Sequence, residues 1–489
     1  MDRIARIISA VLLQTAFLSC GDFLDESPLS DFTAPAGGEV TGFKDIGEAQ
    51  SALNGAYSRF MTDLYQFNIF LIGDVMTDNC YVGGDGVNEE QFDKLSVSPT
   101  NSVIALSWKQ YYELAGTASS VIARAELMAD DKETRVQRNR IVAEAKFIRA
   151  WAYFDIVRLW GDAPVTTGIV TSLTDSDKDV WYPAVYPERT PAEDIYAMIL
   201  DDLDDSVIES LPGSGSGCFH ATKGAAYGLR AKVSATMGEK SGRDYAAVVS
   251  DCDKVMDEGY SLVGDFDLLW QPDGEFSTES IFEISFDKGS MENWAYRLLL
   301  TDKDGEISVS WRRYCTPSHD LLARFDKQSD SRYASSVFWT EVPYSIYYPA
   351  DNYPLSYKIR SRMSNIILLR LADILLLKAE ALVELGRPKE ALAIVNDIRS
   401  RAGAAPVDEN MDAALARLAV ENERQLELYM EGHRWFDLIR NDRMEEVMGE
   451  ATDKYGNPIV ADASGLHRLM PIPQNQIDIN ENLVQNEGY

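Results

Sequence analysis

The chain has 489 residues, an apolar content of 45% and a formal net charge of −32 at pH 7. Its length is sufficient for one large core or a few smaller domains, and its composition is typical of a soluble globular protein. The acidic balance excludes nucleic acid and anionic membrane surfaces as partners, because both would repel it. Neutral ligands, cations and basic partners stay open, as does the simpler interpretation that the charge only keeps the surface soluble.

The N-terminus has the pattern of an export signal. Arg3 and Arg6 precede a short apolar run that is too short to span a bilayer comfortably. The sequence Phe17-Leu18-Ser19-Cys20 then resembles the lipobox of bacterial lipoproteins, in which the cysteine becomes the lipid-modified first residue. We therefore expect residues 1–19 to be a signal peptide, and acyl chains on Cys20 to anchor the chain to a membrane. Ordinary secretion with cleavage elsewhere is the alternative.

After the anchor, residues 20–47 are rich in Gly, Pro, Ser and Asp, which predicts a partly extended tether. We expect the remainder, residues 48–489, to form a single domain. Without Cys20 the chain keeps four widely separated cysteines, with no metal-binding spacing, and its four histidines are scattered. We therefore expect no metal ion or cofactor, and we expect the cysteines to be buried free thiols rather than a disulfide.

Helical periodicity begins near Ile46 and is sustained over residues 103–128 and 135–159. The stretch 73–100 has no sustained period and is predicted to be a loop. The polar stretch 165–190 also lacks a period, so a second loop is expected there.

A further helix is predicted over residues 191–209, where a threonine and a proline provide a cap and a first turn. Residues 222–260 then show two amphipathic arms joined by a short turn. This pattern predicts an antiparallel helical hairpin.

Residues 261–365 change in character, because they contain short β-like runs such as Ser280–Phe286 and little helical period. The segment is rich in tryptophan and tyrosine, and the rings considered are Trp270, Trp294, Tyr296, Trp311, Tyr314, Trp339, Tyr344, Tyr347, Tyr348, Tyr353 and Tyr357. Irregular segments run over protein surfaces, where aromatic rings can stack on sugar rings. The competing interpretation is that most of these rings hold the loops against the scaffold, with two or three touching ligand.

A second hairpin is predicted over residues 366–403, with its first arm starting at Ile367 and with Leu375 in its apolar stripe. Gly386 suits the end of the first arm, and Pro388 suits the first turn of the second. The length and turn match a tetratricopeptide-type repeat. The predicted fold class is therefore mainly α, with tetratricopeptide-like helical hairpins and an irregular, loop-rich insertion that carries short strands.

Six segments, in order along nearly the whole mature chain, resemble the SusD/RagB family. They are AEAKFIRAWAYFDIVRLWGDAPV (143–165), RTPAEDIYAMILDDLD (189–204), ILLRLADILLLKAEAL (367–382), NDIRSRAG (396–403), ENERQLELYMEGHRWFDLIRN (421–441) and LMPIPQNQIDINENLVQNEGY (469–489). The resemblance implies a surface-exposed lipoprotein of the outer membrane that binds nutrients, usually glycans. It also implies a lid on a TonB-dependent, SusC-like transporter, with a helical scaffold supporting an irregular binding region.

The charged residues in these motifs are expected to be structural. Arg370 and Asp373 are three apart in an apolar stretch, a spacing that predicts a partly buried ion pair. Glu427 and Glu431 have a spacing that fits the carboxylate pair of a glycosidase, but charged helices carry such pairs routinely. No phosphate loop, nucleophile elbow or metal motif accompanies them, so we predict a binding protein rather than an enzyme.

The candidate ligand-binding residues come from composition and placement in irregular segments, since the family motifs do not assign them. They are Asn79, Tyr81, Trp294, Tyr296, Trp311, Tyr314 and Trp339. We expect ring stacking together with hydrogen bonds from Asn, Asp and Arg side chains. The alternative, from a different functional class, is a helical-repeat scaffold that binds a protein or peptide.

Overall fold

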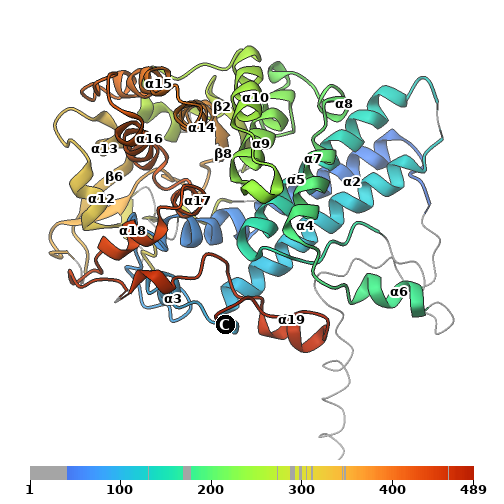
Figure 1. Ribbon diagram of the computed structural model, residues 1–489, viewed down its shortest axis with the longest axis horizontal. Helices are drawn as coiled ribbons and strands as arrows, with labels where there is room; N and C mark the ends of the chain where they lie inside the picture. The colour runs from blue at the N-terminus through green and yellow to red at the C-terminus, as the bar shows by residue number, and fades with distance from the viewer. Residues whose placement is uncertain are drawn as a thin grey trace, which may run out of the picture.

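The fold is built mainly from antiparallel helix pairs, with short strands gathered on one side (Figure 1). The computed structural model describes residues 41–489 except for several short gaps. The gaps are residues 130, 169–177, 272–273, 287–291, 297–299, 304–305, 310–311, 344, 346–347 and 461. The predicted signal peptide, Cys20 and most of the predicted tether lie outside the described residues.

Three long helices form the N-terminal part of the scaffold: α2 (Ile46–Ser58), α4 (Ser102–Glu126) and α5 (Arg135–Trp160). α4 and α5 pack against each other, and α2 contacts both. Asn101 begins α4, because its side-chain oxygen accepts hydrogen bonds from two backbone N–H groups of the first turn. The helices predicted from periodicity in this part of the chain are thus confirmed.

The helix predicted over 191–209 is two helices, α7 (Ala192–Asp202) and α8 (Asp205–Ile208). The break has a local cause. The carboxylate of Asp204 accepts hydrogen bonds from two N–H groups of the following turn, so this residue caps a new helix instead of continuing the first.

A short helix, α6 (Lys178–Val185), lies in the stretch 165–190 that was predicted to be loop, so that prediction was wrong for these residues. Pro183 inside the helix weakens its sequence signal, since proline removes a backbone donor. The next hairpin is confirmed: α9 (Lys223–Thr236) and α10 (Tyr245–Asp257) pack together along their length.

The C-terminal hairpin is also confirmed, with α14 (Leu371–Glu384) followed by α15 (Pro388–Arg401). Gly386 takes a φ of +74° at the turn, a conformation that costs glycine little, and Pro388 occupies the first turn of the second arm. α16 (Ala413–Leu428) packs against both arms. In Figure 1 α14 lies beside α10, and α15 and α16 lie on the other side of α14.

The first arm of this hairpin begins four residues later than predicted. Ile366–Arg370 forms strand β8, which pairs antiparallel with β2 (Ser280–Ile284), and Ile284 lies opposite Ile366. A short apolar run fits a buried strand as well as a helix, so periodicity alone could not separate the two. The strand predicted near Ser280 is the pairing partner, and this pairing makes Ile366–Arg370 a strand.

Most of the predicted stripe in α14 is buried, including Ile374, Ala379 and Leu382, but one position differs. Leu376 is fully buried, whereas Leu375 is only half-buried. The buried side chains of α14, α15 and α16 form a core cluster of their own, made of Ala372, Leu376, Ala379, Leu382, Val383, Ala391, Leu392, Val395, Ile398, Ala416 and Val420. A much larger cluster spans the rest of the chain, from Phe43 to Leu483.

Three short helices complete the C-terminal part: α17 (Arg434–Arg440), α18 (Met444–Glu450) and α19 (Gln474–Ile479). The segment before α19 returns to the end of α5, where the indole N–H of Trp160 donates to the carbonyl of Pro471 at 3.0 Å. The C-terminal segment therefore packs against the end of α5 in the N-terminal part of the scaffold.

The segment predicted as an irregular insertion contains short elements between stretches of loop. They are the 3₁₀ turn η7 (Phe266–Trp270), β3 (Leu300–Lys303), β4 (Glu306–Val309), β5 (Thr316–Pro317), α12 (His319–Arg324), α13 (Ser331–Ser336), β6 (Val337–Thr340) and β7 (Tyr353–Ser356). The strands pair only in twos, as β1–β5, β2–β8, β3–β4 and β6–β7. The prediction of a loop-rich segment with short strands is confirmed.

The predicted loop 73–100 is partly structured, and its first part, residues 73–83, is buried. Two π-helical turns, η2 (Leu64–Asn68) and η3 (Leu71–Val75), lead into β1 (Cys80–Tyr81), and α3 (Glu90–Asp93) follows. β1 pairs with β5, which brings this stretch against the irregular segment.

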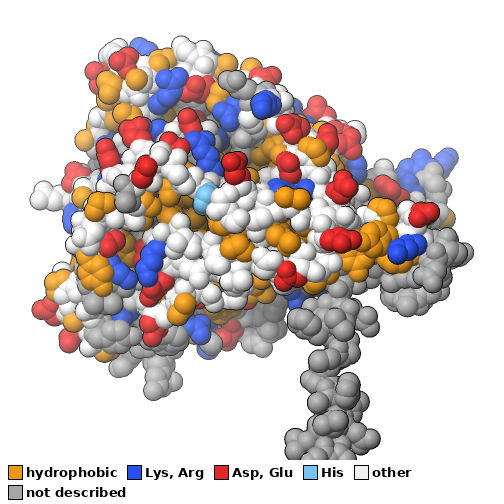
Figure 2. Space-filling model, turned by 60° about the horizontal axis from the view of Figure 1, so that its bottom comes forward, with side chains coloured by type: hydrophobic (Ala, Val, Ile, Leu, Met, Phe, Trp, Pro, Cys, Tyr) orange, Lys and Arg blue, Asp and Glu red, His pale blue; other side chains and the backbone are white. Residues whose placement is uncertain are grey.

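The surface and the cysteines agree with the expectations from composition. In the view of Figure 2, acidic side chains are scattered over the visible face with basic ones between them, so on this face the charge is not gathered in one patch. The cysteines of the described residues are buried free thiols: Cys80, Cys218, Cys252 and Cys315.

Candidate functional site

The charged family-like motifs build a buried ion network rather than a site. The guanidinium of Arg370 donates to Glu279 at 2.7 Å, to Glu427 at 2.6 Å and to Glu431 at 2.7 Å. Arg332 joins the network through Glu427 at 3.0 Å and through neighbouring carboxylates. All of these side chains are almost completely buried.

The predicted pair between Arg370 and Asp373 does not form. Arg370 ends β8 and turns toward the network, whereas Asp373 lies in the first turn of α14. Asp373 instead pairs with Arg424 at 2.9 Å and with Lys232 at 2.5 Å. The spacing of three failed as a guide because the two residues belong to different elements.

Glu427 and Glu431 are therefore not a catalytic pair. Burial alone would raise the pKa of Glu427, but the guanidinium groups of Arg401, Arg370 and Arg332 hold it well below its usual range. The pKa of Glu431 is lowered in the same way, against burial, chiefly by Arg370. A general acid needs a carboxyl group that keeps its proton, and here both carboxylates are held ionised.

A row of aromatic rings lies where the irregular segment meets the π-helical turns. Phe67 of η2 packs against Trp294, with ring centroids 5.7 Å apart, and against Tyr314, with centroids 5.8 Å apart. Trp294 is half-buried, and its side chain donates a hydrogen bond to Asp63. Partial burial raises the pKa of Asp63, and this hydrogen bond opposes the shift. The structure thus brings together two of the predicted residues through a third that was not predicted.

A second set of rings lies beside Arg313, the residue before Tyr314. The guanidinium of Arg313 lies 4.8 Å from the ring centroid of Tyr353, which packs edge-on against Tyr348 at 5.7 Å. Tyr348 in turn packs edge-on against Trp339, with ring centroids 6.1 Å apart. Trp339 is half-buried, and its indole N–H donates to the hydroxyl of Tyr333 at 2.7 Å. These rings, from Phe67 and Trp294 to Trp339, are called the aromatic row below.

A glycine-rich turn covers the middle of the aromatic row. A Cβ atom at Gly84 would lie 2.1 Å from the carbonyl oxygen of Arg312 and 2.8 Å from the ring of Tyr314. A Cβ atom at Gly86 would lie 2.8 Å from the hydroxyl of Tyr314. Only glycine allows this close approach. The run Val82-Gly-Gly-Asp-Gly86 was the available sequence signal for this contact, and the sequence interpretation did not use it.

Two of the predicted site residues lie in the interior. Asn79 is 1% exposed, and its amide donates to Asp74 at 2.9 Å and accepts from Gln425 at 2.9 Å. Tyr81 is also 1% exposed, and its hydroxyl accepts a hydrogen bond from the backbone of His319. Burial raises the pKa of Tyr81 to about 12. Neither side chain presents a surface to a ligand in this structure, because pairing of β1 with β5 turns this stretch inward.

The remaining two predicted residues add no exposed ring to the row. Tyr296 is buried, with 5% exposure. Trp311 lies outside the described residues. Tyr314 is also largely buried, so the half-buried rings at the two ends, Trp294 and Trp339, are the predicted candidates with accessible surface.

Neither a metal-binding cluster nor a membrane-spanning helix occurs among the residues that the structure describes. Among them, no group of three or more His, Cys, Asp or Glu side chains is arranged to hold a metal ion. No helix among the same residues combines the length and apolar character needed to cross a membrane.

A mainly helical, repeat-like scaffold that displays aromatic rings from irregular loops defines a binding protein. Comparison with known protein families shows which kind of binding protein this chain resembles. Residues 327–489 match the family model described as "SusD family", and residues 22–234 match the model described as "Starch-binding associating with outer membrane". The chain belongs to the SusD/RagB family, as the sequence motifs predicted, and this membership agrees with the prediction of a non-catalytic protein.

Individual relatives cover nearly the full length. The SusD-like protein P2 of Formosa agariphila is 26% identical, over 99% of both chains. A SusD homolog from Bacteroides thetaiotaomicron has a solved structure that superposes with a TM-score of 0.75 at 24% identity, covering 92% of this chain and 98% of that one. The surface glycan-binding protein A of the same organism, solved in complex with laminarihexaose, gives a TM-score of 0.72 at 21% identity, over 90% and 99% of the two chains.

Proposed function

We propose that this protein captures oligosaccharides at the bacterial outer-membrane surface and delivers them to a TonB-dependent, SusC-like transporter, for which it acts as a lid. Lipid on Cys20 would hold it at the membrane. The observation that carries the proposal is the aromatic row, because half-buried rings at Trp294 and Trp339 offer flat apolar faces beside polar groups.

The chemistry of the row is suited to a sugar chain. The faces of sugar rings are apolar enough to stack on indole, whereas their hydroxyl groups need donors and acceptors at the edge. Asp63 supplies a carboxylate next to Trp294, and Asp85 is exposed on the glycine-rich turn beside Tyr314. We include Trp311 and Tyr314 among the candidate contact residues, since both lie in the same irregular segment.

Membership of the family supports the general class of ligand, and one relative supports a first choice of probe. A structural relative has been solved with laminarihexaose, and another is described as a laminarin-binding SusD-like protein. We therefore propose laminarihexaose as the first ligand to test, followed by a panel of polysaccharides.

Calorimetric titration of the purified protein with laminarihexaose and the panel tests the site. For the best ligand, Trp294→Ala and Trp339→Ala should each weaken binding by about twofold to tenfold, which corresponds to the contribution of one stacked ring. Trp181→Ala is the control, because Trp181 is a partly buried indole on α6, away from the aromatic row. Unchanged affinity in both row variants, with melting temperature preserved, would place the site elsewhere.

The anchor and the transporter need separate tests. Cys20→Ala should abolish recovery in the membrane fraction and incorporation of labelled palmitate, because the acyl attachment is lost. Affinity purification of the tagged protein from solubilised outer membranes should recover a TonB-dependent transporter. Membrane recovery that does not depend on Cys20 would exclude the lipoprotein interpretation. Absence of a transporter from the purified material would exclude the proposed role as a transporter lid.

A further inference from the structure

A second group of aromatic rings surrounds a cavity at the C-terminal end of α2, called the α2 cavity below. The cavity has a volume of about 200 Å³. Its inner side is lined by Tyr57 of α2, by Phe60 and Met61 of the 3₁₀ turn η1 (Arg59–Met61), and by Phe282 of β2. These side chains give the cavity an apolar floor, and none of them belongs to the aromatic row.

Two phenyl rings stand exposed at the rim of the α2 cavity. Phe219 lines the cavity and Phe276 lies beside it, with ring centroids 5.8 Å apart, and each residue exposes 47% of its surface. Phe276 has a φ of +56°, a left-handed conformation that is costly for an aromatic residue. Its backbone N–H donates to the carboxylate of Glu283 at 3.2 Å, which fixes this conformation. The fold therefore holds a strained residue in place and leaves its ring open to a ligand.

Polar groups with open hydrogen-bonding capacity accompany these rings. His220 stacks on Tyr57 with centroids 4.3 Å apart, and its Nδ1 lies 3.2 Å from the carboxylate of Glu144. In the neutral imidazole Nδ1 therefore carries the proton and Nε2 is an acceptor, and Nε2 has no partner among the described residues. The side-chain N–H₂ of Asn54 and the hydroxyl of Ser285 also line the cavity without such a partner in the described chain. Apolar ring faces with polar groups at the edge suit a sugar residue.

A side-chain amide connects the α2 cavity with the Trp294 end of the aromatic row. The amide of Gln66 donates to the carbonyl of Met61, in the cavity wall, at 2.6 Å. The same amide accepts a hydrogen bond from the backbone N–H of Trp294 at 2.8 Å. The cavity wall and the start of the row are therefore separated by one amide group.

A second connection runs through Ser364 and Asn365. The amide of Asn365 donates at 2.8 Å to Glu283, which lines the cavity. The carbonyl of Ser364 accepts at 2.8 Å from the side chain of Asn293, the residue before Trp294. Two independent links thus place the rings of the α2 cavity next to the end of the row, so one ligand chain can reach both.

The carboxyl groups along this path favour a neutral ligand. Burial raises the pKa of Asp63, Glu275 and Glu283, and hydrogen bonds rather than cationic side chains oppose the shift. An anionic sugar would meet these groups without a neighbouring guanidinium or ammonium group to hold its charge.

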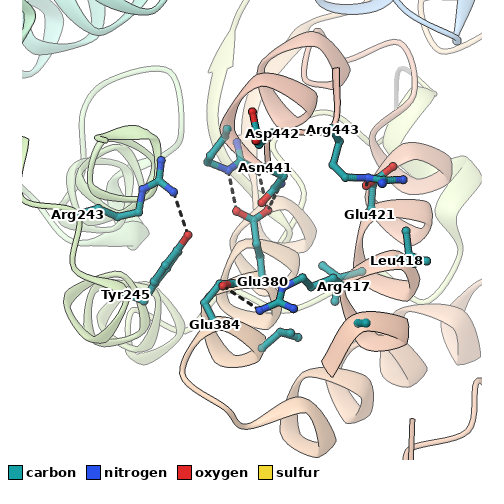
Figure 3. A pocket seen from close by; sticks show the side chains of 14 residues that line it. Arg243, Tyr245, Glu380, Glu384, Arg417, Leu418, Glu421, Asn441, Asp442 and Arg443 are labelled. Atoms are coloured by element: carbon teal, nitrogen blue, oxygen red, sulfur yellow. Dashed lines mark hydrogen bonds and ion pairs between the residues drawn. The ribbon is translucent and has the colours of Figure 1, made fainter. Parts of the chain in front are cut away.

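A larger cavity, of about 460 Å³ between α10, α14 and α16, lacks such a surface (Figure 3). Its charged groups are used by one another, as in the pair of Glu384 with Arg417, and Arg243 and Arg443 lie on opposite sides of it. The one aromatic side chain in its described lining, Tyr245, accepts a hydrogen bond from Arg243. Stacking rings with open polar neighbours are therefore a feature of the α2 cavity and not of this one.

We propose that the α2 cavity extends the glycan site, so that the protein prefers long neutral oligosaccharides to short ones. One part of the chain would stack on Trp294, and residues further along would stack on Phe219 and Phe276. The inference rests on the proposed function, because it takes Trp294 as a glycan contact, and it adds the class of chain that the site accepts.

Calorimetry with a trisaccharide and a hexasaccharide of one linkage tests the proposal. Laminaritriose and laminarihexaose are the first pair, and otherwise the pair comes from the best-binding polysaccharide of the panel. Phe219→Ala and Phe276→Ala should each weaken hexasaccharide binding by about twofold to tenfold, the contribution of one stacked ring. Trisaccharide binding should not change, because the row alone holds the shorter chain. Tyr455→Ala is the control, since Tyr455 is an exposed ring that does not line the cavity.

Two further comparisons identify the interaction. Phe219→Trp should keep the affinity for the hexasaccharide and Phe219→Leu should lose it, because stacking needs a flat ring and not only an apolar side chain. Hexagalacturonate, the charged probe, should bind about tenfold more weakly than the neutral hexasaccharide. Equal binding of the two would overturn the preference for a neutral chain.

The outcomes separate this proposal from the proposed function. If Trp294→Ala weakens hexasaccharide binding and neither phenylalanine variant does, the site ends at Trp294, and only the extension is overturned. If no glycan binds, both are overturned. Equal weakening of the trisaccharide and the hexasaccharide by Phe219→Ala would overturn a site that one long chain spans. Loss of affinity only together with melting temperature would show that the two rings support the fold instead.

Discussion

The hairpin α14–α15 and the irregular segment 261–365 show two ways in which side chains find their neighbours. In the hairpin, apolar residues recur three or four apart on each arm and face the adjacent arm, so a short turn is enough to bring the partners together. In the irregular segment, Trp294 and Tyr314 meet through Phe67, more than two hundred residues earlier in the chain. The hairpin is therefore a local structure, whereas the aromatic row exists only when distant segments have assembled.

The largest effect is expected where the two regions are joined, at the buried ion network. Arg370→Ala should lower the free energy of unfolding by about 3–5 kcal/mol, because it leaves buried carboxylates without a counter-charge. Urea denaturation followed by circular dichroism measures this. The control is Arg387→Ala, which removes an exposed ion pair and should cost less than about 1 kcal/mol. Equal costs for the two variants would mean that the network is not buried as described.

Within the hairpin, Leu376→Ala should cost about 2–5 kcal/mol, since it removes a fully buried side chain from a packed core. Leu375→Ala is the matched variant, one residue away and only half-buried, and should cost clearly less. The same denaturation experiment ranks them. A larger cost at Leu375 would show that the apolar stripe follows the sequence prediction instead.

In the stretch 73–100, which packs against the irregular segment, Asp93 at the end of α3 should make stability depend on pH. Burial raises the pKa of Asp93 to about 6, so the folded state holds its proton more tightly than the unfolded state. Its contribution to stability is full below about pH 4 and is lost as the pH rises through about 6. Relative to the parent, Asp93→Asn should gain about 2–3 kcal/mol between pH 4 and pH 8. If the difference in unfolding free energy between Asp93→Asn and the parent stays constant from pH 4 to pH 8, the raised pKa of Asp93 is contradicted.

The smallest effect concerns the glycine-rich turn. Gly84→Ala should cost about 1–3 kcal/mol, because the added methyl group would displace the turn from Arg312 and Tyr314. Gly215→Ala is the control: an added Cβ there meets nothing within 4 Å, and the change should stay within about 0.5 kcal/mol. Thermal unfolding compares the two. A tolerated alanine at Gly84 would show that the turn does not press on the aromatic row.

The sequence predicted the regular elements well because their contacts are local. Gly386 and Pro388 mark the hairpin turn, and Asn101 marks the start of α4, each through a backbone requirement that can be read from one position. The beginning of the hairpin was misplaced because Ile366–Arg370 becomes a strand only through its pairing with β2, eighty residues earlier.

The candidate site was predictable only as a region. Aromatic residues in an irregular segment pointed to Trp294, Tyr314 and Trp339, but nothing in the sequence indicated which rings would stay accessible. Asn79 and Tyr81 were placed wrongly because a polar, aperiodic stretch was taken to lie on the surface. The same stretch is interior because a distant strand pairs with it.

The buried ion network around Arg370 carries a consequence for the order of folding. The contacts of Arg370 with Glu279, Glu427 and Glu431 span 91, 57 and 61 residues of the sequence. Such contacts must close long loops before they contribute any stability, which slows their formation. Helical hairpins can form while the chain is still incomplete. The network, and the aromatic row assembled around β1 and β5, must wait until nearly the whole chain is present.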